Sequence, residues 1–396
     1  MSAYTRCGAA ALLAVLAVGC AGTQPAPRKA PRPAPESRAT APESRPRAHT
    51  GASVAKAAGR RPFTLVAAGD IIPTHPEVLD TAREDAPYDG YDFRPMLKGV
   101  RPVISSAGLA LCHLEAPLGP LAGPFTGYPV LQAPPQIATA LKATGYDSCA
   151  TASNHVLDHG VPGIRRTLEA LDTVGLRHTG SARDAAEAGR PAVLRAPGGA
   201  RVAQLSYTYG TEDDLDPETP PWSVNLLDEE KIIEDARAAR RAGADVVVVS
   251  PYWGTEYRTA PDEQQLELAR SLTASETDGW PDVDLIVGTH AHTPQPYEKV
   301  NGTWVVYGLG DQLSGAMKQP RGNWGTLARF RFAPPGRTGG RWRVTGAEYV
   351  PQLAEQGKRV RMRNLARTRA HAQIRDEISR AVLSRGAAAD GLTMGR

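Results

Sequence analysis

The chain has 396 residues, of which 41% are hydrophobic and 22% are charged, and its formal net charge is +4 at pH 7. This composition supports a large folded core and excludes a chain that is disordered throughout. Residues 21–61 hold nine basic and two acidic residues, and Arg6 adds one more positive charge, so residues 62–396 carry about −4. A folded part with that charge argues against a nucleic-acid-binding face.

The first 19 residues have the features of a lipoprotein signal peptide. Arg6 supplies a short basic region, residues 9–18 form an apolar run too short to span a bilayer, and the segment 17–20 (AVGC) resembles a lipobox. We therefore expect Cys20 to carry lipid and to anchor an extracytoplasmic protein to the cell membrane or the outer membrane. Plain secretion is the alternative, because alanine is less usual than leucine at the first lipobox position.

Residues 20–61 are predicted to be a tether rather than a domain. They are rich in proline, alanine and arginine, and the sequence APESR occurs at 34–38 and again at 41–45. Such a composition cannot bury a core and favours extended conformations. The basic tether suits anionic lipid or another envelope polyanion, and a solubilising spacer without a partner is an equal alternative.

From residue 62 to about residue 350, strand-like and helix-like segments alternate, which predicts one large α/β domain. In such a domain we expect the functional loops at one edge of the sheets. A barrel of the TIM type would also place them at strand ends. We rank the barrel second, because the segments 207–222 and 304–350 resemble irregular and antiparallel additions.

Apolar spacing and capping residues predict three helices in this domain, at 162–175, 228–243 and 262–272. The tail 351–396 is arginine-rich, and we expect it to be helical over 359–383 and to carry no chemistry.

Two cysteines of the folded part, Cys112 and Cys149, lie in apolar strand-like runs. Small buried thiols commonly pack as core residues, so neither is interpreted as a metal ligand. A disulfide between neighbouring strands is the alternative in an oxidising compartment, and the sequence leaves it open.

Four strand-like runs end in side chains of the kinds that bind metals. These are Asp70 after 63–69, Glu115 after 109–114, Asn154 and His155 after 147–153, and His290 and His292 after 286–289. Carboxylate, carboxamide and imidazole together suit an open, hydrolytic site for a divalent metal. An isolated His-x-His pair would be better explained as two solvated loop histidines, but four such strand ends make coincidence the weaker explanation.

The pair Asn154-His155 has a separate interpretation. Asp158 lies three residues after His155 and could hold and charge its imidazole from the next helical turn. We therefore predict that His155 is a general acid oriented by Asp158, whereas Asn154 gives its amide oxygen to the metal. The alternative is that Asn154 and Asp158 cap a helix.

Together and in this order, the motifs resemble those of the CapA family, the poly-γ-glutamate capsule synthesis proteins, which are similar to calcineurin-like metallophosphoesterases. The motifs are Gly69-Asp70, Leu114-Glu115-Ala116-Pro117, Ser153-Asn154-His155 with Asp158 and Gly160, Trp253-Gly254-Thr255-Glu256-Tyr257, Gly288-Thr289-His290-Ala291-His292 with Gln295 and Pro296, and Leu309-Gly310-Asp311.

This resemblance covers residues 62–315 and implies a two-sheet α/β/β/α sandwich with metal ligands on loops at the sheet edges. It also implies a divalent metal cofactor such as Mn, Zn or Fe. The residues to which it carries a metal-binding role are Asp70, Glu115, Asn154, His290 and His292.

The chain departs from the family pattern at three positions. Tyr252 stands where the family commonly has histidine, His113 where it usually has asparagine, and Asp311 where it usually has asparagine. A phenol is a poor replacement for an imidazole ligand, so a metal position is expected to be weakened. With Trp253 and Glu256, these residues are candidates for substrate contact or for support of the ligands.

Three functions compete. The first is a metal-dependent hydrolase or transferase that acts on a γ-amide or a phosphoester of an anionic, poly-γ-glutamate-like envelope polymer, within a polymer synthesis or export complex. The second is a non-catalytic accessory protein of polymer export or retention with a degraded metal site, as Tyr252 suggests. The third, a solute-binding lipoprotein, leaves the ligand-type residues at four strand ends unexplained.

Overall fold

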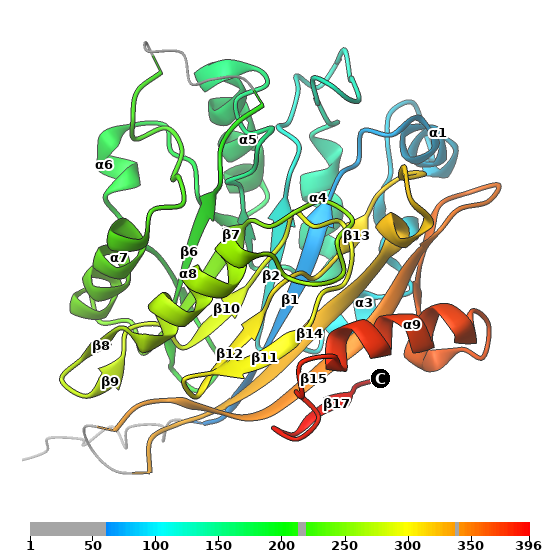
Figure 1. Ribbon diagram of the computed structural model, residues 1–396. Helices are drawn as coiled ribbons and strands as arrows, with labels where there is room; N and C mark the ends of the chain where they lie inside the picture. Colours follow the sequence, from blue (N-terminus) through cyan, green and yellow to red (C-terminus); the bar gives the residue numbers. More distant parts are fainter. Residues whose placement is uncertain (1–60, 213–218, 337–339) are drawn as a thin grey trace, which may run out of the picture. The chain divides into compact units, whose positions relative to one another are not determined.

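Two β-sheets pack face to face and carry helices on their outer surfaces (Figure 1). The computed structural model describes residues 61–212, 219–336 and 340–396. The predicted signal peptide, and the predicted tether apart from Arg61, lie outside the described residues. None of the helices within these ranges is both long enough and apolar enough to cross a membrane.

The larger sheet has nine strands, and its centre is parallel. Its order is β16 (Arg361–Asn364), β15 (Arg343–Glu355), β14 (Trp324–Ala333), β1 (Phe63–Ile71), β2 (Leu109–Leu114), β3 (Ser148–Ala150) and β4 (Arg177–Thr179), with β13 (Asp311–Leu313) beside the end of β1 and β17 (Leu392–Met394) beside β15. Strands β13, β1, β2, β3 and β4 run parallel, so they end at the same edge.

The smaller sheet has six strands and is also parallel at its centre. Its order is β11 (Tyr297–Val300), β12 (Thr303–Val306), β10 (Leu285–Val287), β7 (Val246–Tyr252), β6 (Arg201–Thr208) and β5 (Ala192–Arg195). The outer strands β11 and β5 pair antiparallel with their neighbours. A separate hairpin is formed by β8 (Glu276–Thr277) and β9 (Trp280–Pro281).

Three apolar cores separate the layers, and the alternation of side chains along β1 shows how. Leu65 and Ala67 face the core between the two sheets, which also receives Val248 of β7. Val66 and Ala68 face the opposite core, beneath the helices of the larger sheet. Successive side chains of a strand point to opposite faces, so β1 serves both cores.

The helices cover the outer faces. Those on the larger sheet are α1 (Pro76–Asp85), α2 (Arg94–Leu97), α3 (Arg101–Ile104), α4 (Gln136–Thr144) and α5 (Gly160–Thr173), and those on the smaller sheet are α7 (Glu229–Arg241) and α8 (Glu263–Ala274). The remaining segments are α6 (Ala185–Ala188), α9 (Ala372–Leu383) and the 3₁₀ turns η1 (Pro320–Asn323) and η2 (Leu365–Arg367). The α/β/β/α sandwich is confirmed, and the barrel alternative is wrong because the strands form two open sheets.

The three predicted helices are α5, α7 and α8. Asp228 caps α7 by accepting a hydrogen bond from the Lys231 amide. The capping box of α8 is complete, because Asp262 and Gln265 each accept a bond from the other's backbone N–H at 3.0 Å. These elements depend on contacts within a few residues, which is why the sequence predicts them.

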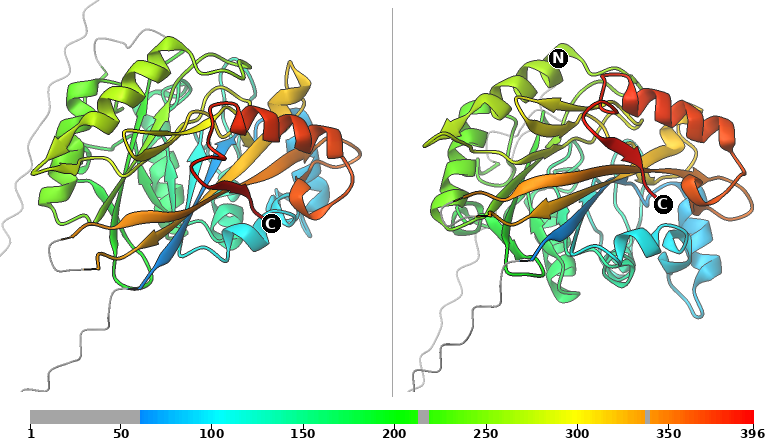
Figure 2. Two further views of the ribbon diagram at one scale, coloured as in Figure 1. Left: turned by 60° about the horizontal axis from the view of Figure 1, so that its bottom comes forward. Right: turned by 90° about the horizontal axis from the view of Figure 1, so that it is seen from below.

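The tail differs from its prediction in its first half. The expected helix over 359–383 begins only at Ala372, because Arg361–Asn364 pairs with β15 as β16. Met362 and Asn364 are buried whereas Arg363 is exposed, which is the alternation of a strand. The predicted domain end at 350 falls inside β15, and α9 packs against β14 and β15 of the same sheet (Figure 2).

Cys112 and Cys149 form a disulfide between β2 and β3. The two residues are register partners on adjacent parallel strands, with 4.4 Å between their Cα atoms. Of the alternatives that the sequence left open, the structure therefore contains the disulfide.

Candidate metal centre

The centre begins at the common edge where the parallel strands of the larger sheet end. Asp70, near the end of β1, is the register partner of His113 on β2 and of Asp311 on β13. All three side chains are buried. Gly69 makes this arrangement possible, because a Cβ atom there would lie 1.7 Å from the carbonyl oxygen of Gly310.

The smaller sheet contributes the His-Ala-His loop that follows β10. His290 and His292 have φ values of 88° and 48°, a left-handed conformation that is unusual for residues other than glycine. Gly288, before the loop, allows close packing, since a Cβ atom there would lie 2.2 Å from the carbonyl oxygen of Tyr307. The backbone is thus shaped to aim both imidazoles at the sheet edge.

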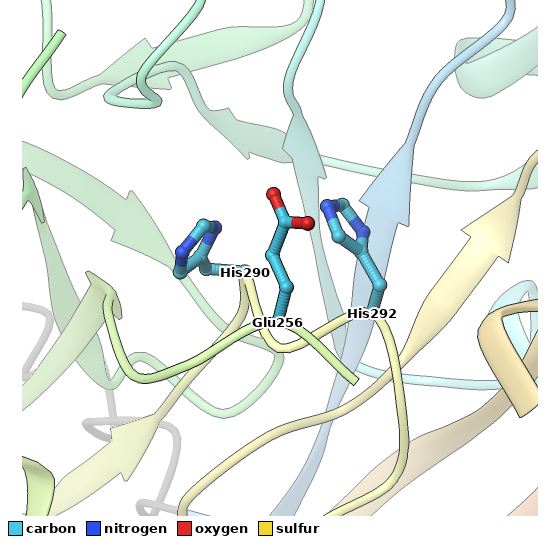
Figure 3. A group of neighbouring side chains, drawn as sticks. All are labelled: Glu256, His290 and His292. Atoms are coloured by element: carbon cyan, nitrogen blue, oxygen red, sulfur yellow. The ribbon is translucent and has the colours of Figure 1, made fainter. Parts of the chain in front are cut away.

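A second loop of the smaller sheet is fixed against the first. The amide of Trp253 donates to the carbonyl of Thr289 at 3.2 Å, and that of Tyr257 donates to the carbonyl of Ala291 at 2.7 Å. These bonds place Glu256 so that its carboxylate lies between the imidazoles of His290 and His292 (Figure 3).

Two overlapping sets of side chains could hold a metal ion. One is Asp70, Glu115 and His292, and the other is Glu256, His290 and His292, with the ligand atoms of each set within 4.8 Å of one another. His292 belongs to both sets. Four of the five predicted ligands are therefore brought together, and Glu256 joins them.

Unpartnered polar atoms show that these residues fit a metal ion. Glu115 Oε2, His290 Nδ1 and Asp311 Oδ2 are all buried, and no hydrogen bond is made to any of them by the residues that the structure describes. A buried polar atom without a partner is costly. Glu115 and His290 each belong to one of the two candidate ligand sets, so a cation bound there would satisfy these atoms. Oxygen and imidazole donors together suit a borderline divalent metal.

The pKa of His290 suits a metal ligand, whereas the pKa values of Glu115 and His292 favour protons that a bound metal would displace. Burial lowers the pKa of His290 to about 3, so its imidazole is neutral and able to coordinate. Burial also raises the pKa of Glu115 to about 7. Although burial opposes it, the carboxylates of Asp311 and Glu115 raise the pKa of His292, and Asp311 Oδ1 lies 2.9 Å from His292 Nδ1. Asp311 thereby orients His292 and supports it as a ligand.

His113 carries a charge and leaves no atom for the metal. Its Nδ1 lies 2.6 Å from Asp70 Oδ1, and its Nε2 lies 3.1 Å from the carbonyl oxygen of Ala152. Both partners accept hydrogen bonds, so both ring nitrogens carry a proton. Burial opposes this charge, but the hydrogen bond and the charge of Asp70 outweigh it and raise the pKa of His113.

Asn154 is held differently from the other predicted ligands. Its Oδ1 accepts a hydrogen bond from the Tyr252 hydroxyl at 2.8 Å, and its Nδ2 donates to Glu212 Oε1. Tyr252 is fully buried, and its ring centre lies 4.6 Å from that of His290. Tyr252 therefore occupies the position beside His290 and binds the amide oxygen predicted to face the metal. Trp253 lies in the core and donates to the Tyr307 carbonyl instead of reaching the cavity.

His155 and Asp158 are in contact in the wall of the same site. His155 Nδ1 lies 2.8 Å from Asp158 Oδ2, which also accepts the Leu131 amide at 2.6 Å. Burial opposes a charge on His155, but its hydrogen bond to Asp158 and the charge of Glu115 raise its pKa. His155 Nε2 lies 3.9 Å from Glu212 Oε1.

A cavity of about 800 Å³ opens in front of these residues. Glu115, Asn154, His155, Glu256 and His292 all line it. Sequence reasoning missed Glu212, which follows an irregular stretch without periodicity, and it placed Glu256 among supporting residues. The Trp-Gly-Thr-Glu-Tyr motif was the available signal for Glu256, but its position beside the histidines depends on backbone bonds between two loops.

The profile of the family described as bacterial capsule synthesis protein PGA_cap matches residues 64–316. The chain belongs to this family.

It is 29% identical to the PGA biosynthesis protein CapA of Bacillus subtilis (strain 168) over 181 residues, which are 46% of each chain. It is 27% identical to the capsule biosynthesis protein CapA of Bacillus anthracis over 184 residues, 46% of this chain and 43% of that protein. The chain thus spans about half the length of these relatives.

Solved structures with a similar course of the chain include the calcineurin-like phosphoesterase YfkN from Bacillus subtilis, with a TM-score of 0.45, 14% identity, and coverage of 81% of this chain and 96% of that one. Another is the 5'-nucleotidase precursor from Thermus thermophilus, with a TM-score of 0.44, 17% identity, and coverage of 74% and 54%.

Replacement of His292 by alanine is expected to abolish stoichiometric metal binding, because His292 belongs to both ligand sets. Metal content after purification and reloading with Mn or Zn, measured by mass spectrometry, checks this. His371→Ala, which changes a histidine paired with Glu355 far along the chain, is the matched control and should keep its metal. Equal metal content in the parent and in the His292→Ala protein would contradict the ligand assignment.

Metal affinity is expected to rise with pH around neutrality. Glu115, with a pKa of about 7, must lose its proton to coordinate, so each unit of acidification below that value should weaken binding by up to ~10-fold for this one proton. The Glu115→Gln protein should bind the metal more weakly, and its metal affinity should depend less steeply on pH, by about one proton. Titrations with zinc between pH 6 and 8 measure both slopes, and identical slopes would show that Glu115 is not a ligand.

Replacement of Tyr252 by histidine is expected to raise zinc affinity by about tenfold, because it places an imidazole beside His290. Tyr252→Phe, which only releases Asn154 Oδ1, is the control for the lost hydroxyl. Competition titrations with a chelator compare the three proteins. Unchanged affinity in Tyr252→His would mean that this position does not face the ion.

Proposed function

We propose that the chain is a metal-dependent hydrolase or transferase that acts on an anionic, poly-γ-glutamate-like polymer of the cell envelope. One observation carries this proposal: two candidate ligand sets that share His292 lie at one sheet edge and open onto a cavity whose wall holds an imidazole paired with a carboxylate. A structural metal would need no such cavity and no proton donor beside it.

The residues that would hold metal form two sets, Asp70, Glu115 and His292, and Glu256, His290 and His292. When bound, a divalent metal supplies a Lewis acid for a carbonyl or phosphoryl oxygen and a water of lowered pKa. The chain itself supplies the orientation of the ligands, through Asp311 against His292 and through His113 against Asp70.

His155 supplies the proton for the leaving group. Asp158 fixes Nδ1 of the ring, which leaves Nε2 as the nitrogen nearest Glu212 and the cavity. The raised pKa keeps the imidazole protonated over a wider range of pH, as a general acid requires. Asp158 is thus a positioning residue for His155.

The setting of the reaction belongs to the same proposal. The lipobox-like segment that ends at Cys20 supports an extracytoplasmic protein held to a membrane by lipid. Family membership and the names of the relatives support association with poly-γ-glutamate or capsule synthesis, and hence with a polymer synthesis or export complex.

A non-catalytic accessory role in polymer export or retention is the second candidate. The observation in its favour is that Tyr252 stands beside His290 and takes the amide oxygen of Asn154, which reduces the ligands available to a second ion. Such a protein would keep a metal without turnover.

The His155→Ala protein separates the two candidates. It should retain its metal and lose turnover by ~100-fold or more, because general acid catalysis contributes this much. Metal content and hydrolysis of an oligo-γ-glutamate and of a phosphodiester are measured on the same samples, with His371→Ala as the control. A metal-loaded parent protein that cleaves neither substrate would support the accessory role, and metal loss in His155→Ala would contradict its assignment as the acid.

A further inference from the structure

The cavity in front of the metal centre is rich in carboxylates and has few basic side chains. Its acidic residues are Asp80, Glu115, Glu212 and Glu256, and the lysine and arginine in its lining are Lys318 and Arg83. Arg83 is already paired, since its Nη1 lies 3.1 Å from Asp80 Oδ1 and its Nε donates to the Tyr91 hydroxyl at 3.1 Å. The lining also holds His75, His155 and His292. Glu115 and Glu256 belong to the two candidate ligand sets, so a bound metal would neutralise their charge.

Lys318 is the exception. No carboxylate of the described residues lies within ion-pair distance of it, and its Nζ lies 5.8 Å from the ring centre of Tyr128. The side chain is exposed, so its ammonium is free to meet a ligand at the mouth of the cavity. Arg83 is paired with Asp80, so Lys318 is the lining cation that can pair with an anionic group of a ligand.

Tyr128 lies between this cation and the proposed acid. Its ring centre is 6.4 Å from that of His155, nearly perpendicular to it, and the side chain is 75% exposed. The loop that carries it is fixed, because Thr126 and Gln132 exchange backbone hydrogen bonds and the Leu131 amide donates to Asp158. The ring therefore stays at the mouth of the cavity without being part of a core.

Apolar side chains adjoin this pair. Leu79 of α1, Phe125 and Leu131 of the Tyr128 loop, and Met317 next to Lys318 all line the cavity. The neighbourhood of Lys318 thus combines one cation, one aromatic ring with a free hydroxyl edge, and an apolar wall. That combination matches an acidic group on a short aliphatic chain better than a hydrated, densely charged group.

We propose that Lys318 and Tyr128 form an anion-binding subsite that takes a carboxylate carried on an aliphatic segment of the substrate. The carboxylate pairs with the Lys318 ammonium and the Tyr128 hydroxyl, while the methylene groups lie against the ring and the apolar wall. Because the Tyr128 ring lies beside that of His155, a carboxylate held here places the adjacent bond of the polymer near His155. This inference rests on the proposed function and names its substrate class.

Binding of a short oligo-γ-glutamate to the metal-loaded protein tests the subsite without requiring turnover. Isothermal titration should show binding ~5-fold weaker, or more, in Lys318→Ala and in Tyr128→Ala than in the parent. The same oligomer with its carboxylates converted to amides should bind the parent and Lys318→Ala equally. Lys299→Ala removes a lysine over another aromatic ring, Trp304, outside the cavity lining, and should change nothing.

Three results would overturn the subsite. The first is equal affinity of the parent and Lys318→Ala for the charged oligomer. The second is that Lys318→Ala loses as much affinity for the amidated oligomer as for the charged one. The third is tighter, Lys318-dependent binding of a glycerol phosphate oligomer, which would assign the cation to phosphate rather than carboxylate. Metal content is measured in parallel to separate the two proposals. A parent protein that holds metal but binds no oligomer would contradict the subsite alone. A parent protein that holds no metal would contradict the proposed function.

Discussion

The carboxylate of Asp70 ties the two sheets together at the edge where the site lies. One of its oxygens contacts the charged imidazole of His113 in its own sheet, and the other accepts the backbone N–H of His290 from the opposite sheet at 3.0 Å. Asp70 is fully buried, and a buried carboxylate is costly unless it is paired and hydrogen-bonded. The edges of both sheets must therefore come into register before this charge is stabilised, and the same register assembles the ligands.

The metal centre is a consequence of that register. Asp311 on β13 and His113 on β2 flank Asp70 because parallel strands end together, and the His-Ala-His loop reaches them because the apolar core between the sheets fixes the distance between layers. Glu115 Oε2 and His290 Nδ1 have no hydrogen-bond partner among the described residues, and each belongs to a candidate ligand set that includes His292. A cation bound there would lower the cost of their burial.

Tyr252 changes the character of one side of the centre. Its phenol cannot replace an imidazole ligand, but its hydroxyl fixes Asn154, which in turn donates to Glu212 beside the proposed acid His155. A hydrogen-bonded chain thus runs from the smaller sheet to the wall of the cavity. Asn154, Glu212 and His155 all line the cavity, at whose mouth Lys318 and Tyr128 lie.

The sequence by itself determined what depends on near neighbours: the capping box of α8, the cap of α7, the α/β alternation, and the pairing of Asp158 with His155 three residues away. The sequence also indicated ligand-type residues at strand ends, and the resemblance to a known family assigned these residues to one metal site. Only the tertiary structure decided the rest. Arg361–Asn364 is a strand because it pairs with the edge of β15. Glu256 lies between two histidines because backbone hydrogen bonds join the two loops. The amide oxygen of Asn154 accepts a hydrogen bond from Tyr252, 98 residues away. Contacts of that range depend on how layers stack, and no local pattern of residues encodes them.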